Sequence, residues 1–249
     1  MTLTHTLADP RVRAALSRMF ERAAQDDITA ARVSAGLPDG FAPLSPQEHA
    51  DAAVDIYMPI SAAGGELLYN LTRAVRPTTV VEFGMSFGIS TLYLAAAVRD
   101  NGAGRVVTTE LSKDKIAAAR RTFAETGLGD LITVLEGDAR ESLRSLDGPA
   151  DFVLLDGWKD LCLPVLRLLE PRLRPGTLVV ADDIGLSGLR SYLDYVRDPA
   201  NGYQSVTFPV EDGMEISCRL RPKRGLHGTV RRKHRADTRY AARRGRCSF

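Results

Sequence analysis

The stretch VVEFGMSFG, residues 80–88, decides the fold. A short β-branched, apolar run ends here in a loop with glycines at GxxxG spacing, Gly84 and Gly88, and a helical pattern follows over 89–99. Glycine lets the backbone turn tightly from strand to helix and approach a ligand closely. The spacing is neither GxGxxG nor a P-loop, because no Gly-Lys-Ser/Thr follows. Pyrophosphate is therefore a poor candidate ligand. A lone GxxxG is weak evidence for a ligand-binding loop, and the alternative is a tight strand–helix turn.

Strand-like and helical segments alternate on the C-terminal side of this loop. Expected strands are 78–83, 105–110, 132–136, 151–156 and 177–182, and expected helices are 89–99, 113–125, 139–146, 162–172 and 189–196. Two further strands, 205–210 and 215–220, flank an Asp-Gly turn signal. Such alternation predicts an α/β fold, a doubly wound, mostly parallel, seven-stranded Rossmann-like sheet. Upstream, helical patterns cover 8–35, a stretch from Ser45 and 62–75.

Charge divides the chain into regions. Residues 221–249 carry eleven Lys/Arg and one acid, and subtracting these from 33 and 31 leaves 22 basic and 30 acidic residues in 1–220. We therefore predict an N-terminal helical cap (1–75), a core (76–221) and a basic, disordered tail (222–249). A solvated extension is the favoured interpretation of the tail, and a nucleic-acid contact is the alternative.

Composition narrows the class of protein. No apolar run reaches the roughly 18 residues of a membrane span, and the N-terminus lacks the layout of a signal peptide. The three cysteines are odd in number and widely spaced, which fits neither a disulfide framework nor a metal knuckle. We expect a globular protein of the reducing cytoplasm, without a membrane partner.

Polar residues follow the expected strands, where an open α/β sheet binds its ligands. Glu110 could hold a ribose diol, and Asp138 could cap the next helix or bond an adenine amino group. Trp158 could stack on adenine or pack in the core.

Acids also follow the fourth and fifth strands. Asp156, Asp182 and Asp183 would repel one another unless a cation neutralises them, and all-oxygen ligands favour Mg²⁺ or another hard divalent ion. Lys159, beside such a cation, would have a lowered pKa and act as a base. Helix capping is the alternative for the acids.

Together, Glu82-x-Gly84-x-x-x-Gly88, Glu110, DGWKD (156–160) and ADD (181–183) resemble the class I S-adenosylmethionine-dependent O-methyltransferases, above all the catechol O-methyltransferases and their bacterial relatives. The resemblance covers about residues 55–220. It implies that Lys159 is the general base and that Asp156, Asp182 and Asp183 bind the metal. The implied cofactor-binding residues are Met58, Ile60, Glu82, Gly84, Ser90, Glu110, Asp138, Ala139, Asp156 and Trp158.

Two positions depart from the family pattern. Gly157 stands where the catechol enzyme has His, and no counterpart of its second hydroxyl-binding acid occurs near Val206. The predicted function is metal-dependent transfer of a methyl group from S-adenosylmethionine to a hydroxyl of a small molecule, such as a phenol, a catechol-like compound or a hydroxy acid, by a homodimer. Alternatives are a tRNA-modifying O-methyltransferase that uses the basic tail, and a non-catalytic adenosyl-binding scaffold.

Overall fold

The computed structural model describes residues 5–36 and 44–221, so the predicted basic tail, 222–249, lies outside the described residues. Seven strands form one sheet in the order β4-β3-β2-β5-β6-β8-β7. Their bounds are β2 Thr79–Phe83, β3 Arg105–Glu110, β4 Ile132–Glu136, β5 Ala150–Leu155, β6 Leu173–Ala181, β7 Tyr203–Phe208 and β8 Met214–Arg219. The strands β2 to β6 are parallel, and β8 runs antiparallel to both β6 and β7. The predicted doubly wound, mostly parallel sheet is confirmed.

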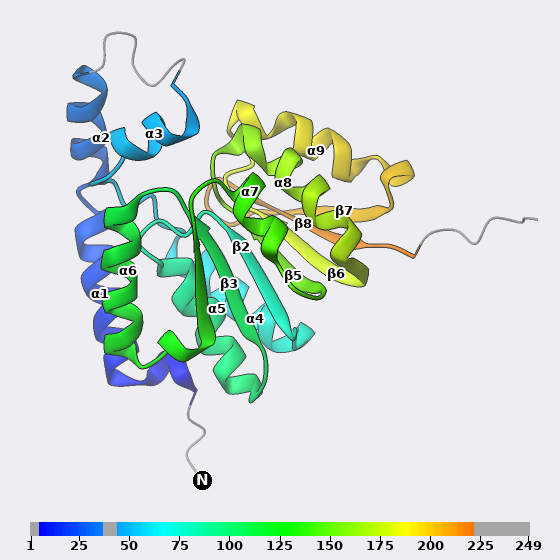
Figure 1. Cartoon of the computed structure of the whole chain (residues 1–249), viewed down its shortest axis with the longest axis horizontal. Coiled ribbons are helices and arrows are strands. Elements are labelled where there is room, and N and C mark those ends of the chain that lie inside the picture. Colours follow the sequence, from blue (N-terminus) through cyan, green and yellow to red (C-terminus); the bar gives the residue numbers. More distant parts are fainter. Residues whose placement is uncertain (1–4, 37–43, 222–249) are drawn as a thin grey trace, which may run out of the picture.

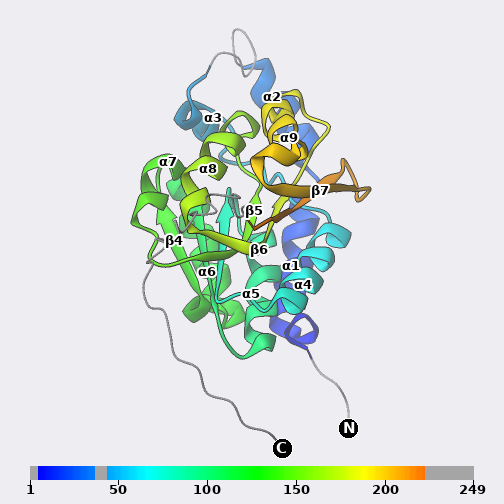
Figure 2. The same cartoon turned by 90° about the vertical axis from the view of Figure 1, so that its right-hand side faces the viewer.

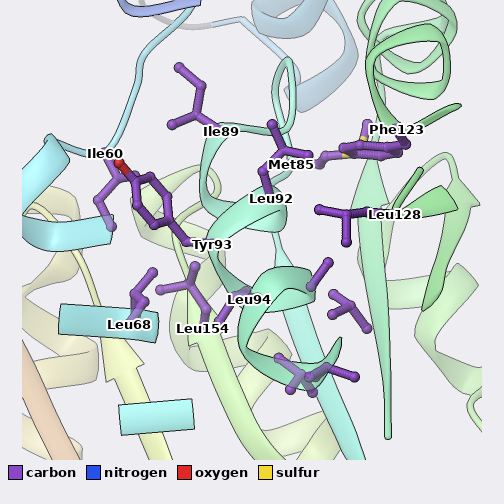
Figure 3. Close-up of a cluster of buried hydrophobic side chains, with 14 of the residues drawn as sticks. Ile60, Leu68, Met85, Ile89, Leu92, Tyr93, Leu94, Phe123, Leu128 and Leu154 are labelled. Carbon is purple, nitrogen blue, oxygen red and sulfur yellow. The ribbon is translucent and has the colours of Figure 1, made fainter. Parts of the chain in front are cut away.

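Helices cover both faces of this sheet (Figures 1 and 2). Their bounds are α1 Pro10–Ala23, α2 Asp26–Ala35, α3 Pro46–Ala52, α4 Ala62–Val75, α5 Ile89–Asn101, α6 Lys113–Thr126, α7 Ala139–Ser142, α8 Cys162–Leu169 and α9 Arg190–Arg197. One hydrophobic cluster joins α1, α4, α5 and α6 to the sheet, with Leu92, Leu94 and Phe123 at its centre (Figure 3). A second cluster joins α7, α8 and α9 to the opposite face. The parallel strands are runs of apolar residues because both faces of the sheet are buried under helices.

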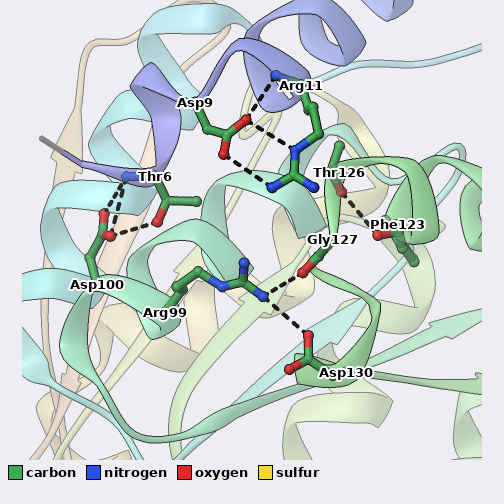
Figure 4. A network of polar contacts seen from close by, with 9 residues as sticks. All are labelled: Thr6, Asp9, Arg11, Arg99, Asp100, Phe123, Thr126, Gly127 and Asp130. Atoms are coloured by element: carbon green, nitrogen blue, oxygen red, sulfur yellow. Dashed lines mark hydrogen bonds and ion pairs between the residues drawn. The ribbon is translucent and has the colours of Figure 1, made fainter.

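Polar contacts fasten the N-terminal segment to α5. The backbone N–H of Thr6 donates to the Asp100 carboxylate at 2.9 Å, and its hydroxyl donates at 2.6 Å (Figure 4). Asp9 caps α1 by accepting the Arg11 N–H at 2.8 Å, as the Asp-Pro signal indicates. The described part of 1–75 thus shares a core with the sheet, and the proposed domain boundary stays a prediction.

The helix expected over 8–35 is in fact two helices, α1 and α2, separated at Ala24 and Gln25. No proline or glycine lies at the break, and only the acids Asp26 and Asp27 in the first turn of α2 mark it locally. The break redirects the chain so that Asp26, in the first turn of α2, accepts the backbone N–H groups of Tyr57 and Met58. A long-range contact therefore overrides the continuous helical pattern.

Two strand boundaries also differ from expectation. β7 begins at Tyr203 and ends at Phe208, two residues earlier than predicted, because Phe208 pairs with Met214 across a five-residue loop rather than a tight two-residue turn. β6 begins at Leu173, four residues early, because Leu173 already pairs with Ala150 of β5, and a register irregularity follows before Leu178 pairs with Phe152. None of the helices formed by the described residues has the length and apolar character that crossing a bilayer requires.

Candidate active site

A cavity of about 400 Å³ opens at the carboxyl ends of the parallel strands, within the usual size range of small-molecule sites. The segment before α4 and the loops after β2, β3, β4, β5 and β6 all contribute to its wall. Nine of the ten predicted cofactor residues line it, together with Lys159, Asp182 and Asp183: Met58, Ile60, Gly84, Ser90, Glu110, Asp138, Ala139, Asp156 and Trp158. The topology therefore brings together residues that are up to 125 positions apart in the sequence (Met58 to Asp183).

Two glycines allow the loops after β2 and β5 to touch. Gly84 has φ of +92°, and a Cβ there would lie 2.5 Å from the Cα of Gly157. A Cβ on Gly157 would lie 2.5 Å from the Phe83 ring. Gly157, the first departure from the family pattern, is thus required by its own packing, because the bulky Phe83 fills the space of a side chain.

Glu110 is fixed by backbone donors at the end of β3. Its carboxylate accepts the N–H groups of Ser86, Leu111 and Ser112, each at 2.8 Å. A carboxylate has about four acceptor sites, so capacity remains for a ligand hydroxyl. Glu110 is therefore held in one orientation in the cavity wall, and ribose binding by it stays a prediction.

Asp138 caps α7, as predicted. It accepts the backbone N–H of Arg140 at 2.8 Å and pairs with the Arg140 guanidinium at 2.6 Å. Trp158 is half-buried, lines the cavity and packs at its other side against the second hydrophobic cluster. The His49 ring meets it edge-on, with centroids 5.1 Å apart. Adenine contacts by Asp138 and Trp158 stay predictions.

Glu82 lies behind the cavity wall rather than in it. Its fully buried carboxylate accepts hydroxyl bonds from Ser90 and Thr91 at 2.6 Å and from Thr108 at 2.5 Å. Burial raises the pKa of Glu82 to about 7, and the hydroxyl bonds only partly oppose this. Its structural role is to hold Ser90, which does line the cavity.

Three carboxylates gather at the ends of β5 and β6. Oxygen atoms of Asp156, Asp182 and Asp183 all lie within 4.8 Å of one another. The sheet sets this spacing: the N–H of Asp156 continues the β2–β5 ladder by donating to Phe83 at 2.8 Å, and that of Asp182 donates to Leu155 at 3.2 Å. Asp183 adopts a left-handed backbone, φ +55°, which places a second acid immediately after the strand.

Lys159 lies between two of these acids. Its Nζ is 3.0 Å from Asp156 Oδ1 and 3.0 Å from Asp183 Oδ2. Burial by itself would lower the pKa of Lys159, but the two negative charges raise it above its ordinary value. Burial and the neighbouring carboxylates raise the pKa of Asp182 to about 8. The sequence predicts a lowered pKa for Lys159 when a cation is bound beside it. That remains a prediction for the ion-bound protein.

The acid cluster fits a hard cation. Three carboxylates and one ammonium leave an excess of negative charge in a largely buried place, where it is costly without a counter-ion. The donors are all oxygen, which favours Mg²⁺, Mn²⁺ or Ca²⁺. Asp160, by contrast, is exposed and stays outside the cluster. The three predicted ligands are thus brought together as a group.

Comparisons with known proteins agree with this geometry. A methyltransferase-domain family model matches residues 81–184. The chain is 30% identical to catechol O-methyltransferase B of Danio rerio over 66% of each chain. The chain belongs to the class I S-adenosylmethionine-dependent O-methyltransferases. It spans about two thirds of the length of that relative, and less of the bovine and mouse catechol O-methyltransferases.

Solved O-methyltransferases share the fold. A putative O-methyltransferase from Klebsiella pneumoniae superposes with a TM-score of 0.63 at 21% identity, covering 86% of this chain and 91% of that one. An O-methyltransferase of tomaymycin synthesis from Streptomyces achromogenes, solved in complex with S-adenosylmethionine, gives 0.62 at 23% identity, covering 80% and 99%. At these identities the likeness concerns the fold alone.

Sequence reasoning missed part of this O-methyltransferase's cavity wall. Four further residues line the cavity: Tyr57, Ser86, Lys115 and Leu186. Ser86 lies in the loop directly after β2, whereas the other three do not directly follow a strand, so their place at the site could not be read from the strand ends. Lys115 is 2% exposed, although it lies in the polar run SKDK, where each lysine reads as a surface residue. Only the packing of α6 against the cavity distinguishes it.

Proposed function

We propose that this chain transfers the methyl group of S-adenosylmethionine to a hydroxyl oxygen of a small molecule, in a reaction that depends on a divalent cation. The observation that carries the proposal is the position of Lys159 and the three acids in the wall of the same cavity as Gly84 and Glu110. Cofactor-type and cation-type residues therefore face one cavity, as a transfer between two bound molecules requires.

The position that we propose for the cofactor rests on the residues that line the cavity. Glu110, at the end of β3, presents a fixed carboxylate to a ribose diol, while Met58 and Ile60 contribute the wall from the segment before α4. Asp156 lines the cavity and is also a candidate cation ligand. A cofactor held by these residues would share the cavity with an acceptor at the acid cluster.

Asp156, Asp182 and Asp183 would hold the cation, which supplies Lewis-acid stabilisation of a deprotonated hydroxyl when bound. Lys159 Nζ lies 3.0 Å from Asp156 and from Asp183. As the ammonium that these two acids favour, it would stabilise negative charge on the acceptor oxygen. Only after a bound cation had neutralised the acids and Lys159 had lost its own proton would it accept the proton of the acceptor. Adjacent oxygens on the acceptor are favoured because both can approach the same cation.

Apolar side chains in the cavity wall support a small acceptor. Met58 and Leu186, which are 43% and 54% exposed, line the same cavity as Trp158 and the acid cluster. The catechol O-methyltransferase relatives act, by their names, on a small diol. The tRNA alternative depended on the basic tail, which lies outside the described residues, and no observation favours it. A homodimer and a cytoplasmic location stay predictions.

The test is a methyl-transfer screen with purified chain and S-adenosylmethionine against vicinal phenols, hydroxy acids and tRNA. We expect transfer to one of the small acceptors, loss of transfer with EDTA, and recovery with Mg²⁺. Asp156→Ala and Lys159→Ala should lose turnover. Transfer that persists in EDTA or in Asp156→Ala would overturn the cation role, and transfer to tRNA alone would overturn the acceptor class.

A further inference from the structure

The backbone of residues 56–60, which we call the strap, passes along the cavity and carries Met58 and Ile60 into its wall. Met58 has φ of +45°, a left-handed conformation that is uncommon outside glycine. Such a conformation persists only where the surrounding structure imposes it, and it is frequent at ligand clamps. The strap therefore needs contacts that hold it.

Side chains from three different elements hold the strap. The Asp26 carboxylate, from α2, accepts the N–H of Tyr57 at 2.9 Å and that of Met58 at 2.7 Å. The Ser86 hydroxyl, from the loop after β2, donates to the Tyr57 carbonyl at 2.6 Å. Lys115 Nζ, from α6, donates to the Ile56 carbonyl at 2.7 Å. Four consecutive backbone groups are thus fixed from outside the strap.

Lys115 connects the strap to the cofactor loop. The same Nζ also donates to Ser86 Oγ at 3.1 Å and lies 5.3 Å from the centre of the Phe87 ring, which in turn stacks on Tyr57 at 4.0 Å. Lys115 therefore contacts both the strap and the loop after β2, and its side chain fixes the distance between them.

The charge of Lys115 is costly where it lies. Burial lowers the pKa of Lys115 to about 8, opposed by the more distant charges of Glu110, Asp26 and Asp55, so that the ammonium persists at neutral pH. Within the part of the chain that the structure describes, Lys115 forms no ion pair, and its Nζ bonds instead to a carbonyl and a hydroxyl. A buried, unpaired lysine is rare, and a methionine would fill the same space without the desolvation cost. Packing alone does not account for this residue.

We propose that Lys115 is a positioning residue for the cofactor: its ammonium ties the strap to the loop after β2, and so keeps Met58 and Ile60 at the spacing that the bound nucleoside requires. This rests on the proposed function, in that S-adenosylmethionine is taken to occupy the cavity. Lys115 acts through the backbone of the strap and takes no part in methyl transfer.

The test compares Lys115→Met with Lys113→Met, an exposed lysine on the same helix turn. Titration calorimetry measures the affinity for S-adenosylhomocysteine, and hydrogen exchange follows the peptide covering 53–61 in the ligand-free protein. We expect Lys115→Met to bind about tenfold or more weakly, because the charge-assisted hydrogen bonds to the Ile56 carbonyl and to Ser86 Oγ are both lost. Exchange at Tyr57 and Met58 should accelerate while that of β2 and β5 does not, and Lys113→Met should match wild type.

Ser86→Ala offers a second variant that leaves the lysine in place. It removes the partner shared by Lys115 and Tyr57, so it should also accelerate strap exchange, and the double variant should lose less affinity than the two single losses combined. Unchanged affinity in Lys115→Met overturns the proposal. Weaker binding with unchanged strap exchange also overturns it, because the lysine would then act on the ligand directly. A wild-type chain that binds no S-adenosylhomocysteine overturns the proposed function itself. In that case, the hydrogen exchange of the strap in the ligand-free variants still tests whether Lys115 holds the strap.

Discussion

Replacing Glu82 by glutamine tests the energetic cost of the acid buried behind the cofactor loop. The carboxylate is fully buried and its pKa is raised from 4.5 to about 7, mainly by burial. Because the folded protein keeps this proton to higher pH than the unfolded chain does, the associated stability is complete below about pH 4.5. It is lost as the pH rises to about 7. The difference corresponds to about 3 kcal/mol.

Glutamine should keep the packing and remove the titration. The amide oxygen can take the place of the oxygen that accepts from Thr91 and Thr108, and the amide nitrogen can donate to Ser90 Oγ once that hydroxyl turns. The variant should therefore fold at both ends of the pH range. Relative to wild type, its unfolding free energy should rise by about 2–3 kcal/mol between about pH 5 and about pH 7.5.

The assay is urea denaturation followed by far-ultraviolet circular dichroism, with EDTA present at both pH values. Comparing variant with wild type at each pH cancels the other titrating groups, including Asp182. Glu66→Gln, at an exposed position on α4, is the matched control and should show no such change. If the difference between Glu82→Gln and wild type is the same at both pH values, the argument from burial is refuted.

Three further substitutions test the cation site, the loop contact and a helix cap. Asp182→Asn should abolish stabilisation by Mg²⁺, which in wild type reaches about 2.7 kcal/mol when the Mg²⁺ concentration is a hundredfold above the dissociation constant. Thermal melts with and without Mg²⁺ measure this stabilisation, and its persistence in the variant would contradict the assignment of Asp182 as a ligand. Gly157→Ala should cost about 1–3 kcal/mol by overpacking, whereas Gly129→Ala, whose added Cβ would meet nothing nearer than 3.6 Å, should cost much less in the same denaturation assay; equal costs would argue against the packing account. Ser61→Ala removes the hydroxyl that caps α4 and should cost about 1 kcal/mol, so an unchanged urea midpoint would show that water replaces the cap.

Most of the site could be predicted from the sequence because the fold places it by rule. Parallel strands end at the same edge of a sheet, so residues that follow successive strands meet there. Glu110, Asp156 and Asp182 were found in this way, and the cavity lining agrees. Glu82 was assigned to the cofactor by the family resemblance and not by this rule. Side chains alternate between the faces of a strand, and the carboxylate of Glu82 is bonded to Ser90 and Thr91 of α5.

Other features depended on contacts between distant segments. The break between α1 and α2 occurs without a proline or glycine, and it serves the bond from Asp26 to the strap. Lys115 and Lys113 are two positions apart in one polar run, yet one is buried and the other exposed. Helical periodicity predicts which residues of α6 share a face. It does not reveal which of those faces packs against the strap, residues 56–60.

The sequence by itself determined the order of strands and helices, and with it the residues that follow each strand, because hydrophobic periodicity and turn chemistry are local properties. Only the tertiary structure decided which side chains support the site from behind. The exclusion of a side chain from Gly157, the burial of Glu82 and the tie made by Lys115 each arise where two segments distant in sequence pack together. The energy of such a contact depends on both partners, and neither partner's local sequence contains it.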